Sequence, residues 1–343
     1  MKKIKNIKHI LKIIFSLSFM FIVIYYFLGK NPDSVIRDLK LIDYRFVILS
    51  FIFGGWAYIN RGLRWISLIN ALGYKSSKIN SIAAVSVGYL TNLFIPRAGE
   101  ISRCTTLNQV EKVPVDKLFG TILVERVIDF IMLIVIMLIS VLLKSGEIIL
   151  AFNKYQDIPK EDSTNTKFII IGFIIVIGIL IYLFRKKVKG TPFYAKIKKF
   201  MLGLKEGFKS IKKIKNKKYF WFHTVSIWAM YFLMTYICFY CMEETSHFTL
   251  SDGLFLLFLG GIGMAIPTPG GIGSYHLMVM IGLVALQVPN GFIMPITEEY
   301  DAYNPALLFP IIIWFAQSLV AIIMGSIGLL ILFLSNKKSN VTS

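Results

Sequence analysis

Long apolar stretches are the feature that most constrains how this chain can fold. They run at about 10–28, 45–60, 118–143, 168–184, 219–241 and 306–334. Most approach or exceed the roughly 20 residues that a helix needs to span a hydrocarbon core. The 56% content of hydrophobic residues and the mean hydropathy of +0.67 agree with this interpretation. We therefore predict an all-α polytopic membrane protein.

The first apolar stretch could be taken for a signal peptide, because it follows the basic sequence MKKIKNIKHI. However, the stretch 10–28 is long for that role, and no small-residue cleavage site follows it. We interpret it as a membrane span that stays in the protein.

Two further apolar stretches, 79–96 and 253–288, contain breaks of the same kind. Residues 95–102 read IPRAGEIS and residues 266–273 read IPTPGGIG, which share the pattern I-P-x-x-G-x-I-x. Proline and glycine break helices, so we expect each stretch to turn back inside the membrane as a re-entrant helical hairpin. The residues expected to make these breaks are Pro96 and Gly99 in the first hairpin, and Pro267, Pro269, Gly270, Gly271 and Gly273 in the second.

Charged residues between the apolar stretches indicate which side of the membrane each connection faces. The basic segments are the N-terminal tail, the segment with Arg61, Arg64, Lys75 and Lys78, the segment 185–218, and the tail with Lys337 and Lys338. In segments 243–252 and 298–301 all of the charged residues are acidic. All basic segments lie on the cytoplasmic side only if both broken stretches turn back. This predicts six full transmembrane helices plus two re-entrant hairpins, with both termini cytoplasmic, in a bacterial-type inner (cell) membrane.

The two octets also suggest an internal repeat. They lie 171 residues apart, and Trp56-Ala57 recurs as Trp228-Ala229 at an offset of 172. One integral membrane domain, 1–343, would then contain two halves, 1–143 and 168–334, each reading span, span, hairpin, span. Three full crossings is an odd number, so the second half would be inserted upside down, as an inverted-topology repeat. The alternative is that two Pro/Gly breaks resemble each other by chance.

The formal charge of +19 is concentrated in flanks and loops. Segment 185–218 alternates lysine with apolar residues, which predicts an amphipathic helix on the cytoplasmic leaflet. Docking of a specific partner by this segment is the alternative. We expect no nucleic-acid binding, because no basic globular face is available for it.

Ionisable residues occur inside the predicted membrane segments. The first hairpin carries Arg97, Glu100 and Arg103, and the span after it carries Glu125, Arg126 and Asp129. A helix entering near Asp116 would place Glu125 roughly 14 Å deep, close to the middle of the bilayer. A central charge costs at least about 2.5 to 3.5 kcal/mol, so we expect these six residues to form one mutually neutralised cluster.

Such a cluster could bind an anion, because the guanidinium fork suits two oxygens of a phosphate. The alternative is a buried salt-bridge network that only holds the hairpin in place. The six residues sum to zero charge, so an arginine would have to leave a carboxylate, or a carboxylate would have to take up a proton. Proton-coupled release is therefore a hypothesis at this stage.

The second hairpin carries no charge but offers Thr268, Ser274 and His276 as polar candidates for substrate binding. His276 could relay a proton, although a packing role is the more ordinary interpretation. We expect no metal site, because no metal-ligand spacing is present, and no cofactor, because the glycine runs lack the setting of a dinucleotide loop. The three cysteines, Cys104, Cys238 and Cys241, are too few for a disulfide framework.

Three ordered motifs carry a resemblance to a known family. P-R-A-G-E-x-x-R at 96–103, E-R-x-x-D at 125–129 and P-x-P-G-G-x-G at 267–273 resemble the transmembrane flippase-like domain of the lysylphosphatidylglycerol synthase family. In its bifunctional members this domain is thought to move a modified phospholipid between leaflets, while a soluble domain makes the aminoacyl lipid. The chain ends at KKSNVTS directly after its last predicted span. We therefore expect a lipid transporter without the synthase domain, and no enzymatic activity.

The resemblance implies that the six charged residues and Pro96 and Gly99 belong to the site, and that the prolines and glycines of the second octet form its hairpin break. The expected partners are membrane lipids: a phospholipid, a lipid-linked sugar or a polyprenyl phosphate. Two other functions stay open, namely transport of a small anionic solute and a non-catalytic scaffold for envelope lipid or glycan synthesis. The sequence leaves the direction, the energy source and the oligomeric state undetermined.

Overall fold

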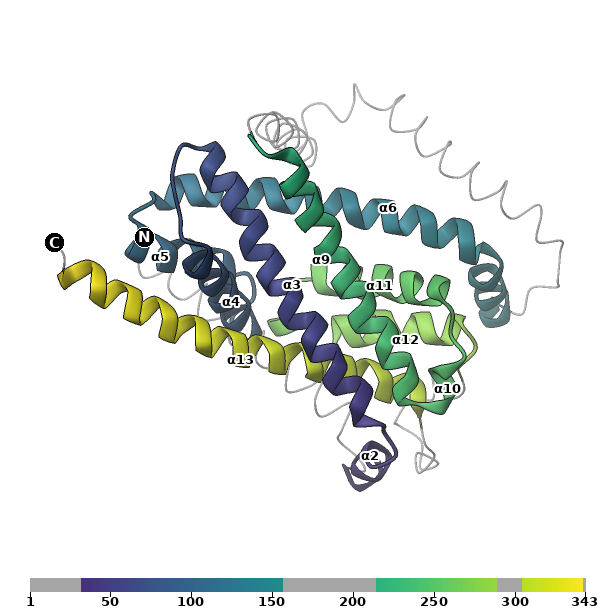
Figure 1. Cartoon of the computed structure of the whole chain (residues 1–343). Coiled ribbons are helices and arrows are strands. Elements are labelled where there is room, and N and C mark those ends of the chain that lie inside the picture. The colour runs from purple at the N-terminus through teal and green to yellow at the C-terminus, as the bar shows by residue number, and fades with distance from the viewer. Residues whose placement is uncertain (1–31, 157–213, 289–303, 342–343) are drawn as a thin grey trace, which may run out of the picture.

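The structure of the protein, a computed structural model, describes residues 32–156, 214–288 and 304–341. Within these residues every regular element is a helix (Figure 1). Four segments are long and apolar enough to cross a membrane: Tyr44–Ala71, Val115–Lys144, Lys217–Cys241 and Pro305–Lys337. They contain four of the six predicted spans. The other two, 10–28 and 168–184, lie outside the described residues.

These four segments belong to the long helices of the bundle. They are α3 (Tyr44–Ala71), α6 (Val115–Gln156), α9 (Lys217–Ile237) with the 3-10 turn η1 (Cys238–Cys241), and α13 (Pro305–Val341). Two short helices, α2 (Pro32–Leu39) and α10 (Glu243–Ser246), complete the connections. Several large apolar side chains on α6 and α13 are exposed, among them Leu142 and Phe333, as expected of helices that face lipid.

Both predicted breaks form helix–turn–helix units. The first consists of α4 (Lys78–Phe94) and α5 (Gly99–Glu111), and the second of α11 (Leu250–Ala265), the 3-10 turn η2 (Pro269–Gly271) and α12 (Ser274–Ala285). Helices α4 and α11 have 17 and 16 residues, fewer than a spanning helix usually needs. The predicted break residues lie in or at the edges of the two turns. Each broken stretch therefore folds as a hairpin of short helices.

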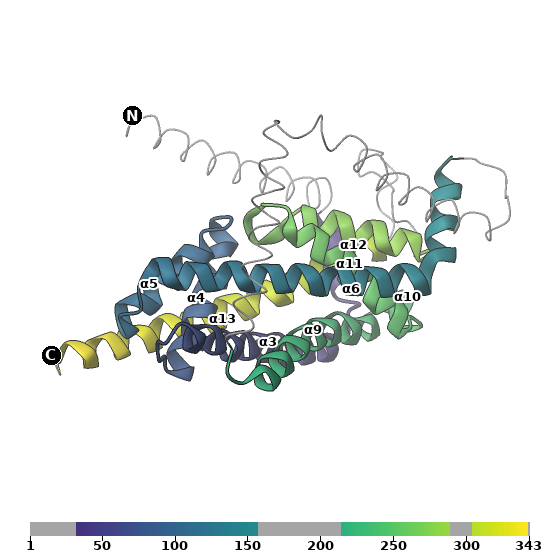
Figure 2. The same ribbon diagram turned by 90° about the horizontal axis from the view of Figure 1, so that it is seen from above.

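Exchanging the two predicted halves reproduces the main pairings of the helices, although the contact of α3 with α13 has no equally close counterpart between α9 and α6. Helix α3 packs along α9, α4 packs on α13, and α11 packs on α6. Adding the offset of 172 to the bounds of α4 gives 250–266, and α11 runs Leu250–Ala265. Helix α6 also contacts α12 and α3, and α9 packs directly on α11; Figure 2 shows α6 from above. Each hairpin is thus held by the last long helix of the other half.

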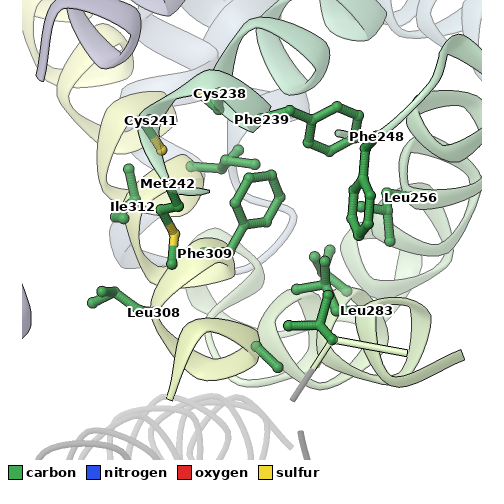
Figure 3. Close-up of a cluster of buried hydrophobic side chains, with 14 of the residues drawn as sticks. Cys238, Phe239, Cys241, Met242, Phe248, Leu256, Leu283, Leu308, Phe309 and Ile312 are labelled. Carbon is green, nitrogen blue, oxygen red and sulfur yellow. The ribbon is translucent and has the colours of Figure 1, made fainter. Parts of the chain in front are cut away.

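Each half has its own apolar core. The core of the first half is built around Trp65, Leu107 and Ile122, and it takes Phe220 from α9 and Leu332 from α13. The core of the second half (Figure 3) is built around Phe239, Phe248, Leu256, Leu283 and Phe309. Burial of these aliphatic and aromatic side chains supplies most of the packing within the bundle.

A buried ion pair fixes the base of the second hairpin. Helix α6 changes direction at Lys144, whose backbone is non-helical (φ −119°, ψ 17°), and the Nζ of Lys144 lies 2.7 Å from Oδ1 of Asp252 on α11. Asp252 also accepts hydrogen bonds from the backbone N–H and the hydroxyl of Thr249, at 2.7 and 2.6 Å. Burial raises the pKa of Asp252, but the hydrogen bonds from Lys144 and Thr249 lower it by a larger amount. The pKa of Asp252 therefore lies below its usual value. The hairpin base is therefore tied to the kink in α6.

Candidate anion-binding site

Five ionisable side chains meet inside the first half of the bundle. Arg61 and Arg64 come from α3, Arg103 from α5, and Glu125 and Asp129 from α6, and all five are buried. The spacings of three residues on α3 and four on α6 place each pair on one helix face. By residue count Asp129 lies at the middle of the apolar segment Val115–Lys144. The cluster therefore lies deep in the part of α6 that is able to cross a membrane.

Asp129 is the most fully satisfied member of the cluster. Its Oδ2 accepts a hydrogen bond from Nη1 of Arg61 at 2.9 Å, and its Oδ1 accepts one from Nη1 of Arg64 at 2.8 Å. Both oxygens are thus paired with guanidinium groups, which offsets the cost of burying the carboxylate. Asp129 joins α6 to α3.

Glu125 is held more loosely. Its Oε2 lies 2.7 Å from Nη1 of Arg103, and its Oε1 lies 3.4 Å from Nε of Arg64. Both distances are in the range of ion pairs, but neither oxygen makes a hydrogen bond of good geometry to a described residue. A close ion pair with Arg103 and a longer one with Arg64 therefore keep Glu125 in place.

Two of the arginines keep one edge of the guanidinium without a hydrogen-bond partner. In both Arg64 and Arg103, Nη1 faces a carboxylate, while Nε and Nη2 are buried and find no acceptor among the described residues. These two nitrogens point their N–H groups to the same side, and this edge can bind two oxygens of one phosphate or carboxylate. Buried donors of this kind are costly to leave unpaired, which points to an anionic ligand.

Aromatic residues hold the arginines in position. The guanidinium carbon of Arg103 lies 3.7 Å from the centre of the Trp65 ring, and Nε1 of Trp65 donates a hydrogen bond to Oγ1 of Thr121 at 2.7 Å. The Nε of Arg61 donates to the hydroxyl of Tyr231 on α9 at 3.1 Å. Stacking and hydrogen bonding restrict the rotamers of these arginines. The site is therefore preorganised before any ligand arrives.

The cluster carries a net positive charge. Three guanidinium groups face two carboxylates, which leaves a formal charge of +1. The sum of zero obtained from the sequence referred to a different set of residues, which omitted Arg61 and Arg64. A single negative charge on a ligand would make this cluster neutral. Binding an anion therefore does not require a carboxylate to take up a proton.

Arg61 and Arg64 correct the sequence analysis, which assigned them to a basic cytoplasmic connection. Both lie inside α3, which continues to Ala71, and they are 5% and 0% exposed. No proline or glycine able to end the helix occurs between Arg64 and Gly73, so the helix extends past the apolar run. Lys75 and Lys78 are left as the basic residues of that flank.

Glu100 and Arg126 form a separate pair at the rim. The Nη2 of Arg126 lies 2.9 Å from Oε1 of Glu100, and the two side chains are 49% and 22% exposed. The expectation that the first hairpin brings Glu100 close to α6 agrees with this contact. Arg126, however, pairs with Glu100 and is far more exposed than the five buried residues of the cluster.

Arg97 lies elsewhere than expected. The sequence analysis placed it beside the α6 carboxylates, but its side chain is exposed and its Nη2 lies 3.5 Å from the carbonyl oxygen of Ala265. Ala265 is the last residue of α11, where the carbonyl groups carry partial negative charge. The backbone of Arg97 is left-handed (φ 61°), which turns its side chain toward the other hairpin. The tips of the two hairpins meet here.

The turn of the first hairpin needs a glycine at position 99. A Cβ on Gly99 would collide with the carbonyl oxygen of Gly88 on α4 and with the amide of Asn92. The backbone N–H of Gly99 donates to Oδ1 of Asn92 at 2.7 Å, just beyond Pro96. This close approach of α4 and α5 sets the position of Arg103, four residues later.

In the second hairpin, Thr268, Ser274 and His276 stabilise the turn itself. The hydroxyls of Thr268 and Ser274 lie 2.8 Å apart, and Ser274 donates to the carbonyl oxygen of Gly263 at 2.8 Å. His276 accepts a hydrogen bond from the N–H of Gly273 at 3.3 Å. The backbone has positive φ at Gly270, Gly271 and Gly273, while Pro267 and Pro269 flank the start of the turn. These hydrogen bonds of Thr268 and Ser274 join residues of the second hairpin to one another and do not involve the arginine cluster.

Comparison with known proteins identifies the family. The family model of the lysylphosphatidylglycerol synthase transmembrane region matches residues 9–301, which include all five residues of the cluster. The UPF0104 membrane protein MJ1595 of Methanocaldococcus jannaschii is 24% identical over 331 residues, covering 87% of this chain and 90% of that protein. No solved structure matches the chain. The resemblance seen in the sequence motifs is confirmed, and the chain belongs to the family of the lysylphosphatidylglycerol synthase transmembrane region.

Proposed function

We propose that this protein is a lipid translocase that moves an anionic or phosphate-bearing lipid headgroup between leaflets. The observation that carries the proposal is the buried cluster around Arg64 and Arg103, where two guanidinium edges have no acceptor in the described part of the chain. Arginine binds phosphate with two parallel hydrogen bonds, and such bonds are strong where water is excluded. The net charge of +1 favours a ligand with at least one negative charge.

The depth of the cluster supports a lipid headgroup as the ligand. A headgroup that crosses the bilayer must pass the hydrocarbon core, where charges are costly unless they are paired. The cluster provides such a pairing partner near the middle of the apolar segment Val115–Lys144. The acyl chains would stay in the bilayer while the headgroup pairs with the arginines.

The packing of the two halves supports an inverted-topology repeat. We propose that the full arrangement is six spans and two re-entrant hairpins, with both termini on the cytoplasmic side of a cell membrane. Transporters built in this way place broken helices and the substrate site between the halves, near the midplane. Reaction of cysteines introduced singly at Lys40 and Lys75, at opposite ends of α3, with a membrane-impermeant maleimide in intact cells tests the topology. Labelling of both positions from the same side would contradict it.

Translocation is tested in liposomes that contain the purified protein and a trace of fluorescent phosphatidylglycerol. Loss of fluorescence after addition of a membrane-impermeant reductant reports how fast the inner-leaflet lipid reaches the outer leaflet. Arg64→Lys and Arg103→Lys keep the charge but lose the two-nitrogen edge, so we expect each to slow translocation by about tenfold or more. Glu243→Gln, which removes an exposed acid far from the cluster in sequence, is the charge-changing control and should behave like the unmodified protein.

Three outcomes would contradict the proposal. Translocation at an unchanged rate in both lysine variants would show that the guanidinium edges do not bind the headgroup. Uptake of soluble glycerol phosphate into sealed vesicles, with no movement of lipid, would favour the small-anion transporter that uses the same cluster. If the protein shows neither activity, and deletion of segment 185–218 impairs envelope lipid or glycan synthesis in cells, the scaffold function would be favoured. Transport rather than catalysis is our proposal for this chain.

A further inference from the structure

The two carboxylates of the cluster are held in different ways, although they lie one helical turn apart on α6. Asp129 accepts a hydrogen bond at each oxygen, at 2.9 Å from Arg61 and at 2.8 Å from Arg64. Glu125 lies at ion-pair distance from Arg64 and Arg103, but neither of its oxygens makes a hydrogen bond to a described residue. Asp129 is held by two hydrogen bonds, whereas Glu125 is held by one close and one longer ion-pair contact.

Glu125 also lies close to the guanidinium edge of Arg64 that a ligand would use. Its Oε1 faces Nε of Arg64 at 3.4 Å, and Nε is one of the two nitrogens of the unpartnered edge of Arg64. Its Oε2 lies 2.7 Å from Arg103, so the carboxylate bridges the two arginines that offer free edges. Glu125 is only 1% exposed, so its attraction to these arginines is little weakened by water.

We propose that Glu125 is an internal competitor, a carboxylate that a phosphate displaces from Arg64 and Arg103 when a headgroup binds. This inference rests on the proposed function and specifies its ligand as a phosphate with two free oxygens, which can accept hydrogen bonds from both guanidinium edges in place of the carboxylate. When the headgroup leaves, Glu125 pairs again with the same arginines. The competition limits how tightly the headgroup is held, which a translocase needs in order to release it.

The two carboxylates provide a matched pair of substitutions. Glu125→Gln and Asp129→Asn each remove one negative charge from the same face of α6 and nearly preserve side-chain volume. If only net charge mattered, both would tighten binding of an anion. On our proposal Glu125→Gln tightens binding by about tenfold, since a charge at this distance shifts equilibria by about one to three powers of ten. Asp129→Asn weakens binding, because Arg61 and Arg64 lose their anchor.

The measurement is a titration of the full-length protein in detergent with short-chain phosphatidylglycerol, read by native mass spectrometry. Short-chain diacylglycerol, which lacks the phosphate, is the lipid control, and Glu243→Gln is the protein control. A parallel titration with glycerol phosphate distinguishes a lipid headgroup from a free phosphate: tightening in the lipid titration alone supports the headgroup. Equal tightening in both would overturn the lipid specificity of the proposal.

The outcomes separate this inference from the proposed function. If Glu125→Gln and a second variant, Glu125→Ala, bind phosphatidylglycerol no more tightly than the unmodified protein, while Arg103→Lys binds it less tightly, then the competitor role is wrong and the anion site stands. If Arg64→Lys and Arg103→Lys bind it as tightly as the unmodified protein, the proposed function fails as well. Folding of each variant is checked by size-exclusion chromatography and by thiol accessibility of the buried cysteines.

Discussion

Asp129→Asn is the substitution whose effect on stability follows most directly from the geometry of the cluster. The carboxylate of Asp129 accepts hydrogen bonds from Arg61 and Arg64 at 2.9 and 2.8 Å, and all three residues are buried. An asparagine keeps one oxygen acceptor but turns an NH2 donor toward the second guanidinium. One arginine would then face a donor in place of an acceptor.

The expected loss of stability can be estimated from two independent magnitudes. A hydrogen bond to a charged group is worth about 1.5 to 3 kcal/mol, and Asp129→Asn removes one and weakens another. Removing one partner of a buried ion pair costs about 3 to 5 kcal/mol, because the remaining charge is left uncompensated. We therefore expect the free energy of unfolding to fall by about 3 kcal/mol. The midpoint of thermal unfolding should fall by on the order of 5 °C.

The protein carries its own reporter for this measurement. Its three cysteines, Cys104, Cys238 and Cys241, are free and buried, so a thiol-reactive dye should react only when the bundle opens. Glu100→Gln is the control, because it breaks the partly exposed pair with Arg126, which should contribute no more than about 1 kcal/mol. Unfolding of the Asp129 and Glu100 variants at the same temperature would refute the view that the Asp129 contacts hold α3 to α6.

Three further substitutions test other parts of the structure. Gly99→Ala should prevent correct folding of the first hairpin, because a Cβ collides with backbone there, whereas Gly120→Ala, with open space around its Cβ, should be neutral or slightly stabilising in the same dye assay. Asp252→Asn should destabilise the protein at pH 7 by about 1 to 3 kcal/mol. The pKa of Asp252 is lowered in the folded state, so the stability gained from its pairing with Lys144 is present above pH 3.8, the ordinary pKa, and is lost as pH falls. The difference in free energy of unfolding between Asp252→Asn and the unmodified protein should therefore shrink between pH 7 and pH 3, and a constant difference would contradict this. Tyr231→Phe removes the hydroxyl that accepts from Arg61 and should cost about 1 kcal/mol, with weaker binding of phosphatidylglycerol; unchanged binding would show that this hydroxyl does not position the site.

The sequence predicted the elements whose signals are local. Apolar runs of sufficient length identified the four described spans, because hydropathy directly reflects the cost of exposing backbone and charge to lipid. The Pro and Gly octets identified both hairpin turns, because few other residues allow those backbone conformations. Glu125 and Asp129 stood out because they interrupt a long apolar helix.

Arg61 and Arg64 escaped prediction because the apolar run before them ends at residue 60, and basic residues after such a run usually mark a flank. Their helical signal was nevertheless present. Arg61, Arg64 and Leu68 recur at spacings of three and four, which places them on one helix face. The partners of these arginines lie more than 60 residues away on α6, and no local pattern reports such a contact. The left-handed backbone at Arg97 was equally invisible in the sequence, because that residue type rarely adopts it.

The two predicted halves have similar helix pairings but differ in the charged residues that they bury. At the offset of 172, Leu233 corresponds to Arg61 and Tyr236 corresponds to Arg64. A second buried cluster would add a further desolvation cost, and the second half instead fills its interior with side chains such as Phe239 and Phe309 (Figure 3). The proposed repeat would therefore account for the arrangement of helices, whereas all five residues of the ionic cluster come from the first half. If the protein translocates a lipid, as we propose, a site in one half has to serve both leaflets. The contact of Arg97 with Ala265, where the hairpin tips meet, joins the second hairpin to the hairpin that carries Arg103.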